Sequence, residues 1–410
     1  MSDSLGDIIQ KLLPDATRFL QELVRIPSLP GQEQEAMLFC ECEFKKLGVN
    51  VERVPLSDAL KKDPDYSDPI PDIGYNGRFN LRVVRKGMGQ GKKLLVNAHT
   101  DVVPPSEGMA DPYGARVENG ILYGRGACDD KGQVAVLWLA MKALDALKVK
   151  TSGDLVGHVV VEEENGGNGS LAMARTKEQA DGCIVLEASE GKLFTSIRGA
   201  VWFRVVLHGV AGHSGQAGQT RSALLMARDA IAALEKYHAD LLASSRGFPL
   251  FDPYPNPMPI TFGKLQAGNW PAAAPSRASM EGVLGLLPNK TKEQVMAGMR
   301  EALEKAADRA LAGHFDLSFM YRHDSSVVER THPFSQAILA ASFAAGAPLE
   351  VGAMTASCDA WFYNNQLGIP TVVMGAGTLK VAHSKDEQIP LRSVADTAHT
   401  LAEFARSFCG

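Results

Sequence analysis

The chain has 410 residues, which is more than one ordinary hydrophobic core holds, so two domains are expected. Its formal net charge is −5 and no long basic run occurs, so neither a nucleic acid nor a membrane surface is an expected partner. The sequence predicts no membrane span and no secretion signal, because its apolar runs are too short for either. Six scattered cysteines without a CxxC pair predict no disulfide framework and indicate a reducing cytoplasm.

The first half of the chain alternates predicted helices with predicted strands. The strands are expected at residues 49–56, 80–87, 92–99, 154–164 and 183–189, and the helices at 32–47, 133–148 and 170–180. Gly48 stands just past the first of these helices, where glycine is favoured. Residues 57–78 are rich in Asp, Pro, Gly and Tyr and are expected to form a surface loop that could help line a substrate pocket. The alternation favours an α/β fold with a mostly parallel, helix-covered sheet.

The pattern changes near residue 199. Strands are expected at 200–210, 259–268, 277–287 and 314–324, and helices at 221–243 and 292–311. A helix at 332–346, a buried strand at 369–377 and a helix at 393–408 then resume the first pattern. The sequence therefore predicts one α/β domain made of residues 1–198 and 324–410. It is interrupted by an inserted α+β domain of residues 199–323, in the position of a lid or dimerisation domain.

Polar side chains gather where the predicted strands of the first domain end. They are His99 and Asp101, Asp129 and Asp130 in YGRGACDDKG, Glu162, Glu163 and Glu164, Glu187, and His383 in VAHSKDEQ. In an open parallel sheet, functional groups collect outside the carboxyl ends of the strands. We therefore expect these side chains to lie near one another.

Each of these groups has an ordinary alternative explanation. A single strand-end histidine is usually a packing or surface residue, and an Asp-Asp pair before a helix is often a cap. Three consecutive glutamates are usually a solvated face, and Glu187 could simply pair with a lysine. Their joint occurrence favours metal binding, because carboxylates crowded into a low-dielectric cleft are costly unless cations neutralise them. The set holds enough nitrogen and oxygen ligands for two divalent ions that share one carboxylate.

Six motifs occur in the order found in one enzyme family. They are AHTDVVP, YGRGACDDKG, VEEENGG, the glutamate of VLEAS, GVAGHSG and AHSKDEQ. The chain resembles the zinc metallopeptidases and amidohydrolases of the acetylornithine deacetylase, succinyl-diaminopimelate desuccinylase and carboxypeptidase G type. The resemblance spans nearly the whole chain. It implies a catalytic domain with two divalent metals, most often zinc with cobalt or manganese as alternatives, and an inserted lid or dimerisation domain.

The resemblance also implies roles at the first metal. His99 matches one of its ligands, and Asp101 matches the group that hydrogen-bonds the other ring nitrogen of that histidine. Asp129 matches the carboxylate that bridges the two metals, and Glu187 the last ligand of the first metal. Asp130 falls where the family varies and receives no role.

At the second metal, the resemblance implies Glu164 and His383 as ligands, and Glu163 as the general base. The register within the three glutamates leaves an alternative, in which Glu162 and Glu163 form the pair. The spacing to Gly166 favours Glu163 and Glu164.

Further matches lie in and after the insert. His213 in GVAGHSG matches a histidine that reaches the substrate oxyanion, often from the neighbouring subunit of a homodimer, and Asn269 matches a residue near the substrate. Asp359 resembles an acid close to the site. Many relatives carry an arginine in an insert strand to meet a substrate carboxylate, whereas SMEGVLGLLP has none, and Arg277 stands out of register for that role.

These matches favour a cytoplasmic, homodimeric, metal-dependent hydrolase that removes the acyl group from a small N-acyl amino acid or related amide. The alternative on the same scaffold is a metallo-carboxypeptidase or dipeptidase, although Glu187 stands where that branch more often has aspartate. A non-catalytic binding protein is a remote alternative, because every expected position is filled. Cys128 is a conceivable nucleophile beside Asp129, but no histidine and asparagine arrangement supports it.

Overall fold

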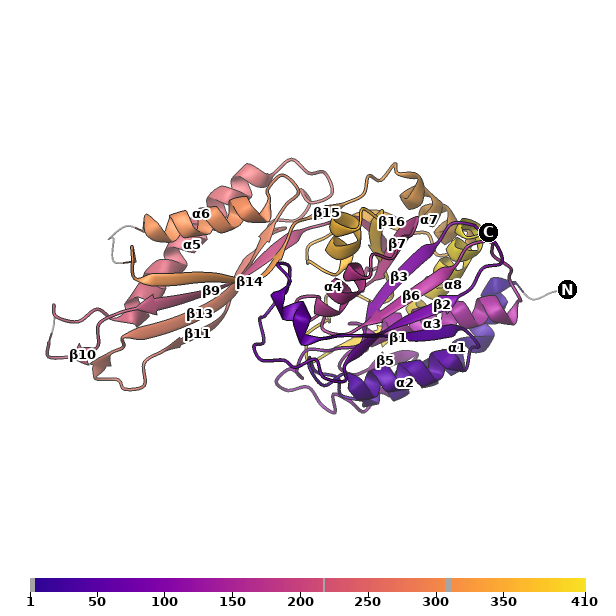
Figure 1. The fold of residues 1–410 in the computed structure, drawn as a ribbon, viewed down its shortest axis with the longest axis horizontal. Coiled ribbons are helices and arrows are strands. Elements are labelled where there is room, and N and C mark those ends of the chain that lie inside the picture. Colours follow the sequence, from indigo (N-terminus) through magenta and orange to yellow (C-terminus); the bar gives the residue numbers. More distant parts are fainter. Residues whose placement is uncertain (1–3, 217, 307–310) are drawn as a thin grey trace.

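A computed structural model of the protein describes residues 4–216, 218–306 and 311–410. Two lobes make up these residues (Figure 1). The larger lobe carries both termini and is built on a nine-stranded sheet, whereas the smaller lobe is built on a four-stranded sheet. In the described ranges, no helix is long and apolar enough to cross a lipid bilayer.

The large sheet is parallel in its middle and antiparallel toward its edges. Its strands follow one another in the order β1 (Asn50–Pro55), β2 (Phe79–Arg85), β6 (Leu155–Val160), β3 (Leu94–His99), β7 (Gly182–Leu186), β17 (Thr371–Met374), β8 (Lys192–Ile197) and β15 (Ser326–Val327), and β16 (Glu350–Met354) pairs with β8. The neighbours β6, β3, β7 and β17 run parallel to one another. This confirms the predicted α/β fold with a mostly parallel central sheet.

Helices cover both faces of this sheet. One face packs against α1 (Leu5–Arg25), α2 (Gln34–Lys45), α3 (Lys131–Ala146), α7 (Pro333–Ala344) and α8 (Leu391–Phe408), and the other against α4 (Asn168–Arg175) and the segment around η2 (Phe362–Gln366). Side chains alternate along β3, so that Leu94 and Val96 belong to the hydrophobic core under the first set of helices, and Leu95 belongs to the core on the opposite face.

Helix α1 has no counterpart in the sequence analysis. Ser4 caps it by accepting a hydrogen bond from the backbone N–H of Asp7, whose side chain accepts one from the backbone N–H of Ser4 in return. A stripe of apolar side chains that includes Ile9 and Leu20 is buried. The same apolar periodicity is visible in the printed sequence, but Pro14 interrupts it and masks the helix.

The smaller lobe is an antiparallel sheet covered by two helices. Its strands lie in the order β11 (Ile260–Ala267), β13 (Arg277–Leu286), β9 (Gly199–His208) and β14 (Phe315–His323), with α5 (Ala223–Ser245) and α6 (Lys292–Glu304) packed on it. The helix expected at 292–311 ends at Glu304, and residues 307–310 of that prediction lie outside the described residues. A short ribbon of β10 (Gly212–His213) and β12 (Ala273–Ala274) lies at the end of this lobe that is remote from the larger one (Figure 1).

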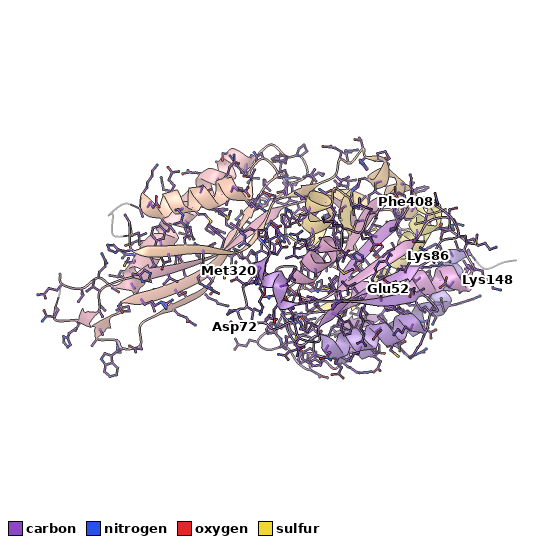
Figure 2. All side chains as sticks on the ribbon, viewed as in Figure 1. Glu52, Asp72, Lys86, Lys148, Met320 and Phe408 are labelled. Carbon is purple, nitrogen blue, oxygen red and sulfur yellow. The ribbon has the colours of Figure 1, made fainter. Side chains whose placement is uncertain are left out.

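The loop of residues 57–78, which contains η1 (Asp58–Lys62), ties the two lobes together. The Asp68 backbone N–H donates to the carbonyl of Met320 at 3.0 Å, and the Arg322 guanidinium donates to the carbonyl of Tyr66 at 2.7 Å. Met320 and Asp72 both lie at the junction of the lobes (Figure 2). A small three-stranded sheet of β4 (Arg116–Glu118), β5 (Ile121–Tyr123) and β18 (Gln388–Pro390) completes the larger lobe.

Candidate metal centre and active site

The predicted site residues of the larger lobe converge at the carboxyl ends of the central strands. His99 ends β3, Glu163 and Glu164 follow β6, Glu187 follows β7, and Asp129 precedes α3. His383 reaches the same place from a loop between β17 and β18. Two groups could each hold a metal ion, with ligand atoms within 4.8 Å of one another: His99, Glu163 and Glu187, and Asp129, Glu164 and His383.

His99 is buried and held on three sides. Its Nδ1 lies 3.0 Å from the backbone carbonyl of Asp101 and 3.3 Å from the Asp101 carboxylate. Its Nε2 lies 3.2 Å from Oδ1 of Asp129. Because Asp101 occupies Nδ1, the other ring nitrogen is turned toward the carboxylates, which is the orientation expected of a histidine ligand.

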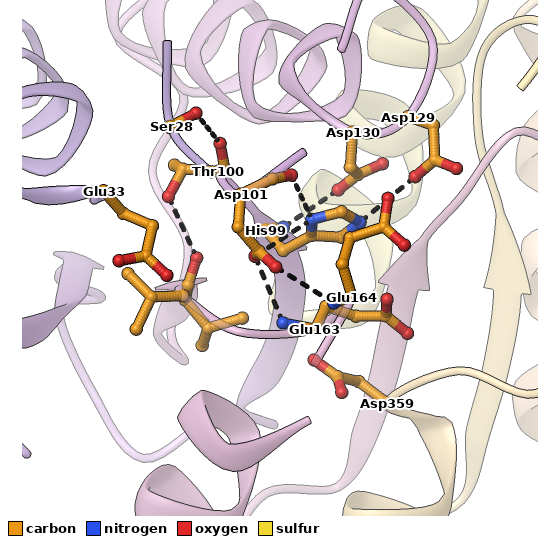
Figure 3. A network of polar contacts seen from close by, with 12 residues as sticks. Ser28, Glu33, His99, Thr100, Asp101, Asp129, Asp130, Glu163, Glu164 and Asp359 are labelled. Atoms are coloured by element: carbon orange, nitrogen blue, oxygen red, sulfur yellow. Dashed lines mark hydrogen bonds and ion pairs between the residues drawn. The ribbon is translucent and has the colours of Figure 1, made fainter. Parts of the chain in front are cut away.

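Asp101 also fixes the turn that carries two of the glutamates. Its two carboxylate oxygens accept the backbone N–H groups of Glu163 at 3.1 Å and Glu164 at 2.9 Å. Figure 3 shows Asp101 between His99 and this turn. One buried carboxylate therefore orients both the histidine of one group and the backbone of both glutamates.

Asp129 lies between the two histidines. Its Oδ1 faces His99, and its Oδ2 lies 3.1 Å from Nε2 of His383. Nε2 of His383 also lies 2.9 Å from Oε1 of Glu164. The two oxygens of one aspartate thus face the two candidate metal groups separately.

Asp130 received no role from the sequence, and the structure gives it one. It is fully buried, and its Oδ2 accepts the backbone N–H of His99 at 2.9 Å (Figure 3). The side chain therefore holds the end of β3 in place. The sequence held no sign of this contact, because an Asp-Asp pair before a helix is equally typical of a cap.

Glu162 points away from the cluster into a separate buried network. Its carboxylate accepts hydrogen bonds from Tyr75 Oη at 2.8 Å and Asn168 Nδ2 at 3.0 Å, and it forms an ion pair with Arg78. Arg78 also pairs with Glu33 at 2.7 Å. The structure brings Glu163 and Glu164 to the cluster and leaves Glu162 outside it. Tyr75 is buried in this network and does not line an open pocket.

Burial and mutual repulsion raise the pKa of the three glutamates of the cluster, whereas hydrogen bonds with the two histidines lower that of Asp129. Burial, with repulsion from Asp359 and Glu187, holds the pKa of Glu163 well above its usual range. Burial, with repulsion from Asp130 and Asp129, does the same for Glu187. The protein on its own thus concentrates negative charge at this point.

The two histidines respond in the opposite sense. Burial alone would lower the pKa of His99, but the Asp130 carboxylate and its neighbours outweigh burial and hold this pKa well above the usual value. Burial likewise opposes the charge of His383, but hydrogen bonds with Asp129 and Glu164 raise its pKa to about 11. Both rings therefore bind a proton strongly where no other cation balances the carboxylates.

This donor set fits divalent metal ions. Among the described residues, no lysine or arginine forms an ion pair with the six side chains of the two groups, so the excess negative charge lacks a protein counter-ion. Imidazole nitrogens and carboxylate oxygens are the ligands that zinc takes in catalytic sites. A pair of dications would offset the cost of burying these carboxylates.

The residues predicted in the insert do not reach this cluster within one chain. His213 is exposed on β10, where its Nδ1 accepts the backbone N–H of Gly215 at 3.1 Å, and Asn269 is exposed in the loop after β11. Both belong to the smaller lobe, and β10 lies at its remote end (Figure 1). Arg277, the first residue of β13, is also exposed.

Asp359 lies beside Glu163 in the cluster (Figure 3). Its Oδ2 accepts a hydrogen bond from the Ser170 hydroxyl at 2.5 Å, and burial raises its pKa to about 6. Cys128 is buried, and burial with repulsion from Glu387 raises its thiol pKa well above the usual value. A protonated, buried thiol is a poor nucleophile, which agrees with the metal interpretation of this turn.

Comparison with known proteins places the chain in a family. The model of peptidase family M20/M25/M40 matches residues 95–407. The chain belongs to peptidase family M20/M25/M40. The match confirms the predicted resemblance and the predicted enzyme class, a hydrolase of amide bonds.

Relatives of this M20 chain carry several activities. An N-formyl-4-amino-5-aminomethyl-2-methylpyrimidine deformylase from Halalkalibacterium halodurans is 25% identical over an alignment of 446 residues that covers 98% of each chain. The fold matches the dipeptidase Dug1p from Saccharomyces cerevisiae with a TM-score of 0.80 at 13% identity, covering 99% of this chain and 98% of the other. It also matches a Bacillus subtilis protein described as a dinuclear metal binding M20 peptidase, with a TM-score of 0.66 at 15% identity, covering 98% and 99%.

Proposed function

We propose that this M20 hydrolase binds two divalent metal ions, zinc in the first instance, and removes the acyl group from a small N-acyl compound. The observation that carries the proposal is the convergence of His99, Asp129, Glu163, Glu164, Glu187 and His383 at one edge of the sheet. Cobalt and manganese are accepted by similar ligands, so the metal in the cell is part of what needs to be measured.

The two ions divide the ligands between them. His99 and Glu187 would hold the first ion, Glu164 and His383 would hold the second, and Asp129 would be shared between them. The contacts of Asp129 with both histidines support this division. Asp101 supports it from behind by fixing the ring of His99.

Glu163 serves as the general base. When bound, the metal pair supplies an electrophile for the amide carbonyl and acidifies water. Glu163 takes the proton of the attacking water and returns it to the amine nitrogen as the carbon–nitrogen bond breaks. A carboxylate in this place can accept the proton of water in the first step and release it in the second.

The acyl substrate is favoured over a peptide by two observations. One relative that is similar over nearly the full length acts, by its name, on an N-formyl amide of an aminomethylpyrimidine. In addition, β13 carries no arginine or lysine after its exposed first residue, Arg277, so the strand offers no further cation for a substrate carboxylate. A small N-acyl amine without a carboxylate, with this formylated pyrimidine as the first candidate, fits both.

His213 completes the site from a second copy of the chain. Its exposed position on the remote end of the smaller lobe excludes contact with its own cluster but leaves it free to enter that of a partner. There it would donate a hydrogen bond to the oxyanion formed at the substrate carbonyl. A homodimer is therefore the proposed active form, in the cytoplasm.

The test is a turnover assay by mass spectrometry on chelator-treated protein with zinc or cobalt restored. The panel holds the formylated pyrimidine, N-acyl amino acids, and dipeptides. Glu163→Gln should abolish turnover and keep the metals, whereas Glu162→Gln should chiefly lower thermal stability. Metal-restored deacylation supports the proposal, and cleavage of dipeptides alone would move the enzyme to the alternative, a dipeptidase or carboxypeptidase. A chain that binds no metal would refute it.

A further inference from the structure

The loop that carries His383 needs an anchor outside its own backbone. Residues 375–387 form no helix or strand, and His383 itself has a positive φ of 57° with a side chain that is 51% exposed. The His383 ring must nevertheless meet Glu164 and Asp129, which belong to rigid parts of the larger lobe. Other contacts must therefore fix both the loop and the position of Asp129 relative to His383.

A buried ion pair next to the loop supplies that anchor. Arg125 and Glu387 pair through Nη1 and Oε2, and their side chains are 1% and 0% exposed. The pairing of β18 with β5 brings them together, because Gln388 lies opposite Tyr123. Desolvation by burial opposes the charge of Glu387, and Arg125 offsets that cost.

Arg125 reaches His383 through one serine. Its Nη2 donates to the hydroxyl of Ser106 at 2.8 Å, and this hydroxyl donates in turn to the backbone carbonyl of His383 at 2.8 Å. Nη2 also lies 3.4 Å from the carbonyl of Ser384. The guanidinium thus holds the loop at two successive carbonyl groups.

Glu387 holds Asp129 from the other side of the pair. Its Oε1 accepts the backbone N–H of Asp129 at 3.2 Å and that of Cys128 at 3.3 Å. One ion pair therefore fixes the backbone of two proposed ligands, His383 and Asp129, which are far apart in the chain.

We propose that Arg125, Glu387 and Ser106 are positioning residues for the second metal ion, and that their contacts affect its affinity more than that of the first. This inference rests on the proposed two-metal function. Besides Asp129, which both ions would share, the first ion depends on His99 and Glu187, which stand at the ends of β3 and β7 and make no contact with this anchor. Loss of the anchor should therefore weaken the second site more than the first.

The variants are Ser106→Ala and the double substitution Arg125→Met/Glu387→Met, which removes both charges together so that neither is left buried alone. The matched control is Arg82→Met/Glu178→Met, an arginine–glutamate pair of the same lobe at 2.7 Å that contacts no proposed ligand. Metal content by mass spectrometry and two dissociation constants by chelator competition are measured on folded, full-length protein. Ser106→Ala keeps the test valid if the double variant fails to fold.

We expect the second dissociation constant to rise about 10–100-fold in the double variant and less in Ser106→Ala, and the first to rise much less than the second. The Arg82→Met/Glu178→Met control should match the wild type at both sites. Equal weakening of both sites in the double variant, or no weakening of either, would overturn this inference. The proposed function would still stand in that case, provided that the wild type binds two ions. A wild type that binds no metal would overturn both.

Discussion

Replacing Arg78 by methionine should destabilise the larger lobe strongly. The Arg78 side chain is 7% exposed and is the cation for two buried carboxylates, Glu33 at 1% and Glu162 at 0%. Removing one partner of a buried ion pair typically costs about 3–5 kcal/mol of unfolding free energy, because the remaining charge loses its compensation. For a lobe of this size we expect the Tm to fall by about 5–15 °C.

The loss should depend on pH in a defined direction. Burial raises the pKa of Glu33 to about 7 even with Arg78 opposing it. Since this folded-state pKa lies above the unfolded value, Glu33 is protonated in both states at low pH and gains nothing from Arg78 there. Glu33 stays protonated in the folded state up to about pH 7, so its share of the deficit should be absent below that pH and grow above it.

The assay is thermal unfolding followed by circular dichroism from pH 4 to pH 8, with Arg53→Met as the matched control. Arg53 pairs with Glu41 at 2.6 Å, but its side chain is 49% exposed, so its loss should lower the Tm far less than the loss of Arg78. Equal Tm shifts in the two variants would refute the argument from burial. A deficit that grows as the pH falls would refute the assignment to Glu33.

Three further outcomes are expected. Asp101→Asn removes one acceptor from the turn that carries Glu163 and Glu164, and it should weaken metal binding about 10–100-fold, as measured by chelator competition. An unchanged metal affinity would contradict the orienting role of Asp101. Metal binding at pH 7.5 should release protons, because the pKa of His383 is raised to about 11. Calorimetry in buffers of different ionisation enthalpy should detect this release, and a binding heat that does not depend on the buffer would contradict the prediction. Phe203→Ala, in the core of the smaller lobe, should cost about 3–5 kcal/mol there and leave the metal content of the larger lobe intact; loss of metal would contradict independent lobes.

Much of the cluster could be predicted because strand ends are readable in the sequence. His99 and Glu187 follow short apolar runs, and parallel strands bring their carboxyl ends to one edge of the sheet. The order of six motifs supplied the rest, including His383, which follows no strand directly. The sequence pattern therefore predicted which side chains would meet, and the structure brings them together.

What could not be predicted depends on contacts between segments far apart in the chain. The direction of Glu162 is set by Tyr75 and Arg78 across 87 and 84 residues, and no local pattern encodes such partners. The same holds for Glu387, whose hydrogen bond to Asp129 spans 258 residues. His213 matched its motif, yet its distance from the cluster depends on how far the smaller lobe extends from the larger one (Figure 1).

The order of the segments has a consequence for synthesis of the chain. Strand β17 enters the sheet between β7 and β8, and it is made after the whole of the smaller lobe. His383 is made later still. A chain emerging from the ribosome can complete the smaller lobe early, whereas the gap in the larger sheet and the second half of the cluster stay unfilled until the last few dozen residues arrive. A chain that ends before β17 therefore lacks both an inner strand of the large sheet and one histidine of the cluster.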